Sequence, residues 1–167
     1  TSLLFVFAVS SPVQAQQEDL NCYKYMDAIV QDDFGALESA LSGQVDINCT
    51  EEVWGGGNYT TVSPLIFAIE QDKTDIVRWI LTHGGNPIQQ VHQEYYSEQI
   101  IIPLMAAVQK NVDMTLLLLN YKADPNYVMK DDSNEMTGES TPLMYAIDGS
   151  IVNVLVGFGA NVNTEIS

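Results

Sequence analysis

Residues 141–146 read TPLMYA, and two related blocks precede them, SPLIFA at residues 63–68 and IPLMAA at residues 102–107. Each block carries one Pro-Leu pair, and the prolines stand at positions 64, 103 and 142, which are 39 residues apart each time. An apolar helical pattern follows every block. Self-similarity at a fixed period of this size is typical of repeat architectures, in which each unit is one supersecondary element.

A second recurring motif closes the units. It contains Gly or Asn and reads HGGNP at residues 83–87, KADPN at residues 122–126 and GANVN at residues 159–163. An earlier, degenerate copy runs from residue 26 to residue 48, where the closing motif is QVDIN. The sequence therefore predicts four units.

Proline favours the first position of a helix, because its φ is already fixed near −65° and the helix does not need its missing N–H there. Each block should therefore start a short first helix that buries small or branched residues, in the fourth unit Leu143, Ala146 and Ile147. A second helix should present an apolar stripe, such as Ile151, Val152, Leu155 and Val156. One helix pair cannot bury its own apolar face, but stacked neighbours can. We therefore expect an α-solenoid of helix-turn-helix units.

Both motifs resemble those of the ankyrin repeat, whose pattern opens with T-P-L-H-x-A and closes with G-A-D-x-N. In this register the four units span approximately residues 22–49, 62–88, 101–127 and 140–163. The chain departs from the pattern at the histidine, which is replaced by Met26, Ile66, Met105 and Met144. The first unit also has Lys24 in place of the proline. The resemblance implies a protein-protein interaction module and no catalytic activity.

The connections between units are long. A standard ankyrin unit has about 33 residues, so a period of 39 leaves a surplus of about six residues per unit. This surplus falls in residues 49–62, 89–101 and 127–140. We expect three extended β-hairpin fingers that project side by side from the stack.

The first 15 residues are expected to be a secretory signal peptide rather than part of the fold. Residues 3–9 read LLFVFAV, and Val13 and Ala15 then form a V-x-A cleavage motif that would leave Gln16 as the first mature residue. No positive segment precedes the apolar run, so we take the signal to be truncated at its start. The alternative is a buried strand of a truncated domain. The ankyrin repeat domain would then cover residues 16–167, and the protein would be periplasmic or secreted.

Cys22 and Cys49 are the only cysteines. In an oxidising compartment an even pair is most simply one disulfide. Two free buried thiols are the alternative.

The charge of the chain narrows the class of partner. With 22 acidic and 6 basic residues, the net charge is −16. Such a chain is repelled by phosphate backbones and by acidic lipid surfaces, which argues against nucleic-acid and membrane binding. No apolar run approaches the roughly 20 residues that span a bilayer. We expect a monomer that binds a basic protein partner.

Motifs for catalysis or cofactor binding are missing from the sequence. It has no G-x-S-x-G, H-E-x-x-H, C-x-x-C or phosphate-binding glycine loop. The stretch DDSNE at residues 131–135 resembles a calcium loop only superficially, because Met136 stands where the glycine should be. We therefore expect no catalytic residue, no metal and no cofactor.

Large side chains in the fingers are the candidate binding residues. Aromatic residues dominate interface energetics, and carboxylates beside them suit a partner with exposed Lys or Arg. The candidates are Trp54, Tyr59, Tyr95, Tyr96, Tyr127, Glu94, Asp131 and Asp132. Packing of finger against finger is the alternative role for each aromatic. Phe67 and Tyr145 should border the concave face, where core packing is the favoured interpretation.

The leading hypothesis is thus an interaction module, acting as an immunity or inhibitor protein or as a scaffold. The alternative is a small metal-binding protein or hydrolase that uses the finger carboxylates. The last helix would expose Val154, Leu155 and Phe158 unless a cap or a fifth unit covers them.

Overall fold

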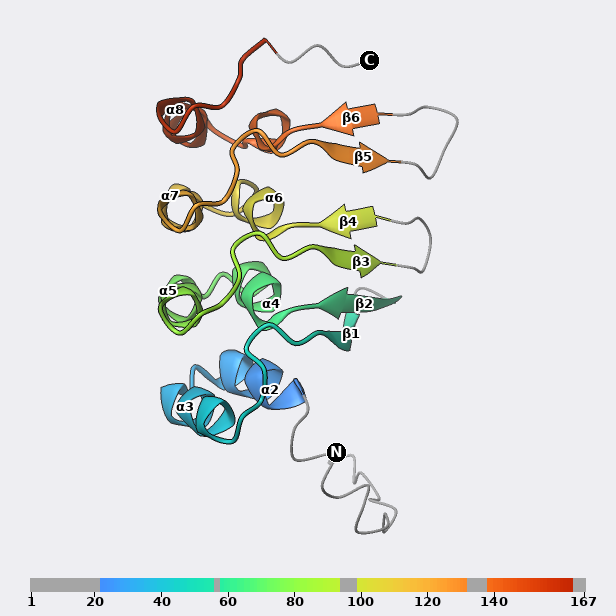
Figure 1. The fold of residues 1–167 in the computed structure, drawn as a ribbon, viewed down its shortest axis with the longest axis vertical. Helices are drawn as coiled ribbons and strands as arrows, with labels where there is room; N and C mark the ends of the chain where they lie inside the picture. Colours follow the sequence, from blue (N-terminus) through green and yellow to red (C-terminus); the bar gives the residue numbers. More distant parts are fainter. Residues whose placement is uncertain (1–21, 56–57, 94–98, 132–137, 164–167) are drawn as a thin grey trace, which may run out of the picture.

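Paired helices form four layers that stack in chain order along the long axis of the molecule (Figure 1). The computed structural model describes residues 22–55, 58–93, 99–131 and 138–163. Each layer contains a first and a second helix joined by a short turn. The layers are α2 (Tyr23–Gln31) with α3 (Phe34–Ser42), α4 (Pro64–Glu70) with α5 (Thr74–Thr82), α6 (Pro103–Ala107) with α7 (Val112–Asn120), and η1 (Pro142–Tyr145) with α8 (Gly149–Gly157).

Three antiparallel hairpins connect successive layers and extend from the same side of the stack (Figure 1). They lie where the surplus length of the repeat predicts fingers. The strands are β1 (Glu51–Gly55) with β2 (Asn58–Val62), β3 (Val91–Gln93) with β4 (Gln99–Ile101), and β5 (Met129–Asp131) with β6 (Gly138–Ser140).

The helix starts follow from local sequence. Pro64, Pro103 and Pro142 each occupy the first turn of a first helix. Ser63 caps α4 by accepting a hydrogen bond from the backbone N–H of Ile66, which satisfies one of the unpaired donors of a helix N-terminus. Second helices are capped in the same way by Asp33, Asn111 and Asp148.

The closing motif reverses the chain in the same way in all four layers. One residue at the start of each closing turn has a positive φ, 63° at Gln44, 95° at Gly84, 71° at Lys122 and 94° at Gly159. The next N–H then bonds back to a carbonyl near the end of the second helix, as Ala123 does to Leu118 at 3.0 Å. Glycine adopts this conformation without strain, and two of the four layers use it.

Asparagines of the closing motif bond one layer to the next. Asn48 Oδ1 accepts a hydrogen bond from the Asn86 N–H at 2.6 Å, and Asn48 Nδ2 donates to the Gly84 carbonyl at 3.2 Å. Asn126 makes the same two bonds to the fourth layer. In the second layer the equivalent position is Ile88, which has no amide and is exposed.

The core is a continuous apolar seam between the layers. Its largest fully buried side chains come from all four layers, and they include Tyr25, Ile29, Leu37, Leu65, Ile69, Ile80, Leu104, Met114, Leu118 and Ile151. Each layer therefore depends on its neighbours for burial, as expected of a solenoid.

The fourth layer differs from prediction at three residues. Ile147, expected to be buried, is exposed, because the first helix is a short 3-10 helix that ends at Tyr145 and the chain is extended at Ala146. Val156 of the expected apolar stripe is also exposed, since no described layer covers that side. Leu155, expected to be exposed, is fully buried in the apolar core, on the helix that contacts α7 of the third layer.

A disulfide joins Cys22 to Cys49, with 5.6 Å between their Cα atoms. It ties the start of α2 to the chain that enters β1. The first layer has no proline at its helix start, and Cys22 makes no side-chain cap. The covalent link therefore fixes the start of α2.

Candidate functional site

Three of the finger residues predicted from sequence lie near the outer ends of the described strands. Trp54 pairs with Tyr59 across β1 and β2, next to the tip, and Asp131 is the last residue of β5, opposite Gly138. The structure places the backbone of these three residues and does not describe their side chains. Glu94, Tyr95, Tyr96 and Asp132 lie outside the described residues.

Tyr127 has a different place. It precedes β5, is half-buried and packs against the apolar core. This contact is with the core and not with a neighbouring finger, and a binding role for Tyr127 stays a prediction.

A groove of about 540 Å³ lies between the first helices of the first two layers and the first finger. Residues from α2, β1 and α4 and its C-terminal end form its walls. They are Tyr23, Met26, Asp27, Val30, Glu52, Val53, Phe67 and Gln71.

The groove combines an apolar surface with carboxylates. Tyr23 is 59% exposed and Val30 57% exposed, although both are large apolar side chains. Val53 and Phe67 are half-buried against the core. Asp27 and Glu52 are exposed, and neither makes an ion pair with any part of the chain that the structure describes. An apolar surface with unpaired carboxylates suits a ligand that has both apolar and cationic groups.

The repeat explains where the groove lies. Asp27, Phe67, Ala106 and Tyr145 occupy equivalent positions on the four first helices. Phe67 was identified from sequence as bordering this face, and the structure adds Tyr23 and Val30. The sequence analysis missed these two residues because the first unit is degenerate. Val30 is apolar and lies outside the buried stripe of α2, and this pattern could have identified it.

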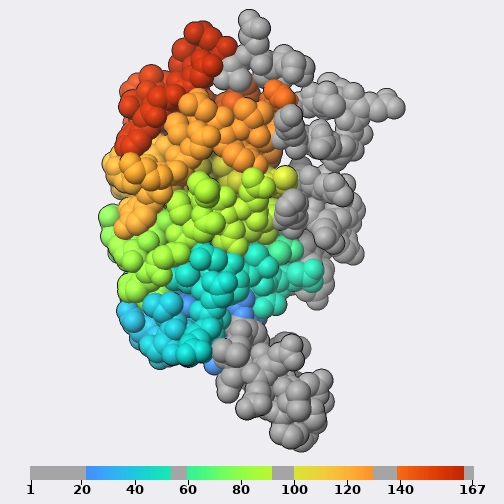
Figure 2. Space-filling model, in the orientation of Figure 1, coloured from blue at the N-terminus to red at the C-terminus, as the bar shows by residue number. Residues whose placement is uncertain are grey.

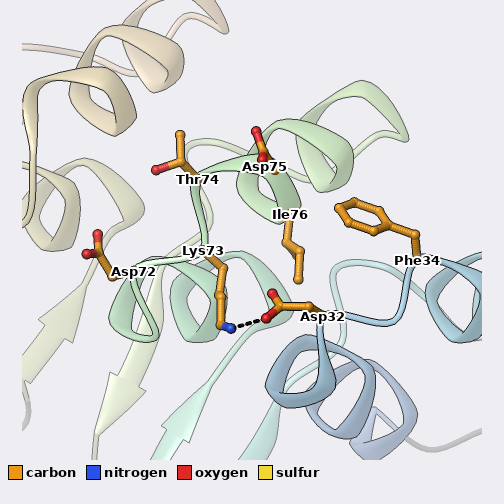
Figure 3. A pocket seen from close by; sticks show the side chains of 7 residues that line it. All are labelled: Asp32, Phe34, Asp72, Lys73, Thr74, Asp75 and Ile76. Carbon is orange, nitrogen blue, oxygen red and sulfur yellow. Dashed lines mark hydrogen bonds and ion pairs between the residues drawn. The ribbon is translucent and has the colours of Figure 1, made fainter.

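A second hollow, of about 440 Å³, lies at the turns between the helices of layers one and two (Figure 3). Figure 3 shows the Lys73 side chain extended toward Asp32, with which it forms an ion pair. The other lining residues are Phe34, Asp72, Thr74, Asp75 and Ile76.

Three polar residues of this hollow, Asp32, Lys73 and Asp72, take part in contacts between layers. Asn111 Nδ2 donates to Asp72 Oδ1 at 2.9 Å, which links the third layer to the second. Lys110 lies 3.1 Å from Glu70 Oε2 and also bonds to the Glu70 carbonyl. Lys73 is paired with Asp32 of the first layer, and Asp72 is bonded to Asn111 of the third. We therefore assign this hollow a structural role.

The comparison with known families agrees with this geometry. Residues 101–130 and 139–165 match the family model of the ankyrin repeat. The chain contains ankyrin repeats. The matches cover the third and fourth layers, and the first two layers repeat the same helix order, closing turn and connecting hairpin. A search of curated proteins finds no match to this chain.

His83, at the closing turn of the second layer, has structural contacts. Its ring stacks on Trp79 with 4.1 Å between ring centroids, and Nδ1 lies 2.7 Å from the Trp79 carbonyl oxygen. Nε2 is 3.6 Å from Glu38, which also accepts a hydrogen bond from the Trp79 indole. These contacts join α3 to α5.

One titratable group of the ankyrin stack has a shifted pKa. Burial raises the pKa of Tyr25 above its usual value, and the negative charge of Asp46 raises it further. The Tyr25 hydroxyl donates to the Val45 carbonyl at 3.0 Å. This bond joins α2 to the first closing turn, so the shift reflects a structural contact.

The described part of the stack has neither a cluster of metal ligands nor a membrane-spanning helix. Within residues 22–55, 58–93, 99–131 and 138–163, no three His, Cys, Asp or Glu side chains gather as a metal site. No helix in these ranges is long and apolar enough to cross a bilayer.

Proposed function

We propose that this chain is a non-catalytic interaction module that binds a basic protein partner through its concave groove and hairpin fingers. Ankyrin repeats generally mediate protein-protein interaction, and the match of residues 101–130 and 139–165 to that family supports the proposal. The observation that carries the proposal is the groove, which exposed Tyr23 and Val30 line together with the exposed carboxylates of Asp27 and Glu52.

The lining of the groove suits binding better than catalysis. Its titratable side chains are two carboxylates and a tyrosine, and none of the eight lining residues is His, Cys, Ser or Lys. Nucleophilic catalysis needs an activated nucleophile beside a base. Aromatic and aliphatic side chains at a concave surface are instead the residues that anchor interfaces.

Charge supports a basic partner. The chain carries −16 overall, and a field of this sign accelerates encounter with a cationic surface. The groove carboxylates would then pair with Lys or Arg on the partner. Binding of this kind weakens as salt rises.

We further propose that the protein works in an oxidising compartment, periplasmic or secreted. The Cys22–Cys49 disulfide supports this, because such bonds persist outside the reducing cytosol. There the module would serve as an immunity or inhibitor protein or as a scaffold. Once a stoichiometric partner is captured, measuring the partner's activity with and without the module would distinguish inhibition from scaffolding.

The test begins with the oxidised, purified chain immobilised to capture partners from the extracytoplasmic fraction of its source cells. A recovered partner is then titrated against wild type and against Val30→Ser and Asp27→Asn. We expect each substitution to raise Kd about tenfold, corresponding to the loss of one interface contact.

The matched control is Ile88→Ser, which removes an equally exposed aliphatic side chain away from the groove. It should leave Kd within about twofold. Equal effects of Val30→Ser and Ile88→Ser would contradict a binding site in the groove.

A further inference from the structure

The first finger has one open strand edge. In the part of the chain that the structure describes, β1 forms a sheet with β2 alone, and β2 lies beside β3 on its other side. Figure 2 shows the first finger, in turquoise, next to the first layer, in light blue. β1 is therefore an edge strand, and such a strand presents backbone N–H and C=O groups that another chain can pair with.

The register of the hairpin shows which backbone groups of β1 face this open edge. Only two residues separate Gly55 from its partner Asn58, so these two form the hydrogen-bonded pair that closes the ladder. Hydrogen-bonded and non-hydrogen-bonded pairs alternate along an antiparallel ladder. The backbone N–H and C=O groups of Glu52 and Trp54 therefore point away from β2.

The open edge borders the groove. Successive residues of a strand point to opposite faces, and the groove is lined by both Glu52 and Val53. None of its lining residues comes from the described residues of β2. The groove therefore reaches β1 from its open edge, and α2 forms the opposite wall.

The two faces of β1 differ in chemistry beside the groove. Val53 is half-buried against the core. Glu52 is exposed, and it forms no ion pair with the residues that the structure describes. A strand laid along the edge would place alternate side chains on these two faces. Apolar side chains would then lie on the face of Val53, and cationic side chains would pair with Glu52.

We propose that the partner contributes an extended segment, with Lys or Arg alternating with apolar residues, that adds to the open edge of β1 as a further strand. This inference rests on the proposed function and specifies what occupies the groove. Main-chain hydrogen bonds to Glu52 and Trp54 supply affinity, and the groove selects the side chains. The net charge of −16 favours a basic segment over an acidic one.

The test uses the oxidised chain and a synthetic peptide of alternating Lys and Val, acetylated and amidated, about six residues long. In the free protein the amide protons of Glu52 and Trp54 should exchange quickly, since they face the open edge. Saturating peptide should slow their exchange at least about tenfold, measured for each residue by NMR. A peptide with Glu in place of every Lys should bind at least about tenfold more weakly.

Substitutions at Trp54 separate the backbone contribution from that of the side chain. Trp54→Pro removes the N–H at the open edge, a position where proline leaves the ladder to β2 intact, whereas Trp54→Ala keeps this N–H. Trp54→Pro should therefore raise Kd for the peptide at least about fivefold over Trp54→Ala. The matched control is Thr61→Pro, which removes an N–H that points from β2 toward β3. It should leave Kd within about twofold.

The outcomes distinguish strand addition from the groove itself. Unchanged exchange at Glu52 and Trp54, in a complex that Val30→Ser still weakens, would overturn strand addition and leave the groove as the binding site. A peptide that does not bind a chain competent for its captured partner would do the same. A complex that neither Val30→Ser nor Asp27→Asn weakens would overturn both the proposed function and this inference.

Discussion

Asn126 accepts a 2.7 Å hydrogen bond at its Oδ1 from the backbone N–H of Asn161, which belongs to the next layer. Its Nδ2 donates to the Gly159 carbonyl at 2.9 Å. One side chain thus satisfies two backbone groups of a closing turn that the helix ladder leaves unpaired. Asn48 does the same between layers one and two.

Replacing Asn126 with Ala should lower the free energy of unfolding by about 1–2 kcal/mol, since both interlayer bonds are lost. This change in the free energy of unfolding can be measured by urea titration with circular dichroism as the signal. Asn153→Ala, at an exposed position of α8, is the matched control and should change stability by less than about 0.5 kcal/mol. Similar losses in both variants would show that the interlayer bonds contribute little.

In the second layer, the interlayer bridge that Asn126 makes can be introduced instead of removed. Ile88 occupies the bridging position, and Asn86 Oδ1 already holds its N–H at 3.0 Å in the same turn. Ile88→Asn should therefore bond to the closing turn of the third layer and raise the free energy of unfolding by about 0.5–1.5 kcal/mol. Ile88→Ser, which cannot span the layers, separates this gain from the removal of an exposed apolar side chain. A gain of equal size in Ile88→Ser would refute the bridge.

The disulfide is expected to contribute strongly to the first layer. It closes a loop with a sequence separation of 27, for which loop-closure entropy predicts a contribution of about 3–4 kcal/mol. Reductant should lower the free energy of unfolding of wild type by roughly this amount and leave the Cys22→Ser/Cys49→Ser variant unaffected.

Reduction should also weaken partner binding, because Tyr23 in the groove adjoins Cys22. Full stability after verified reduction would contradict this role.

Tyr25 should make stability depend on alkaline pH. Its pKa is raised in the folded state, so the folded protein holds this proton more tightly than the unfolded chain. Its contribution is present below the unfolded value of about 10 and is lost as pH rises from there through the folded pKa. Unfolding between about pH 9 and 11 should show a steeper loss for wild type than for Tyr25→Phe. Parallel curves for the two proteins would contradict the assignment.

Much of the architecture could be predicted from sequence, for identifiable reasons. Pro64, Pro103 and Pro142 mark helix starts through a fixed φ, and the closing motifs mark chain reversals, so element order and finger positions follow. The Cys22–Cys49 pairing followed from a count of two. The 3-10 helix at Pro142–Tyr145 could not be foreseen, because it depends on how the shortened turn at residues 146–148 meets α8.

The site was less accessible to sequence reasoning. The finger aromatics drew attention because they lie outside the helical pattern, yet Tyr127 packs on the core. The groove depends on the first layer, whose repeat signature is weakest. Tyr23 and Val30 line the groove because α2 lies beside α4 and β1, and that arrangement is tertiary.

The most direct test of the proposed binding surface is hydrogen-deuterium exchange of the chain with and without its captured partner. We expect slower exchange on binding in α2, α4 and β1, which line the groove. This protection should decline as sodium chloride is raised from about 0.05 to about 0.3 M. Protection confined to α5 and α7, with α2 and β1 unchanged, would place the partner on the opposite face and contradict it.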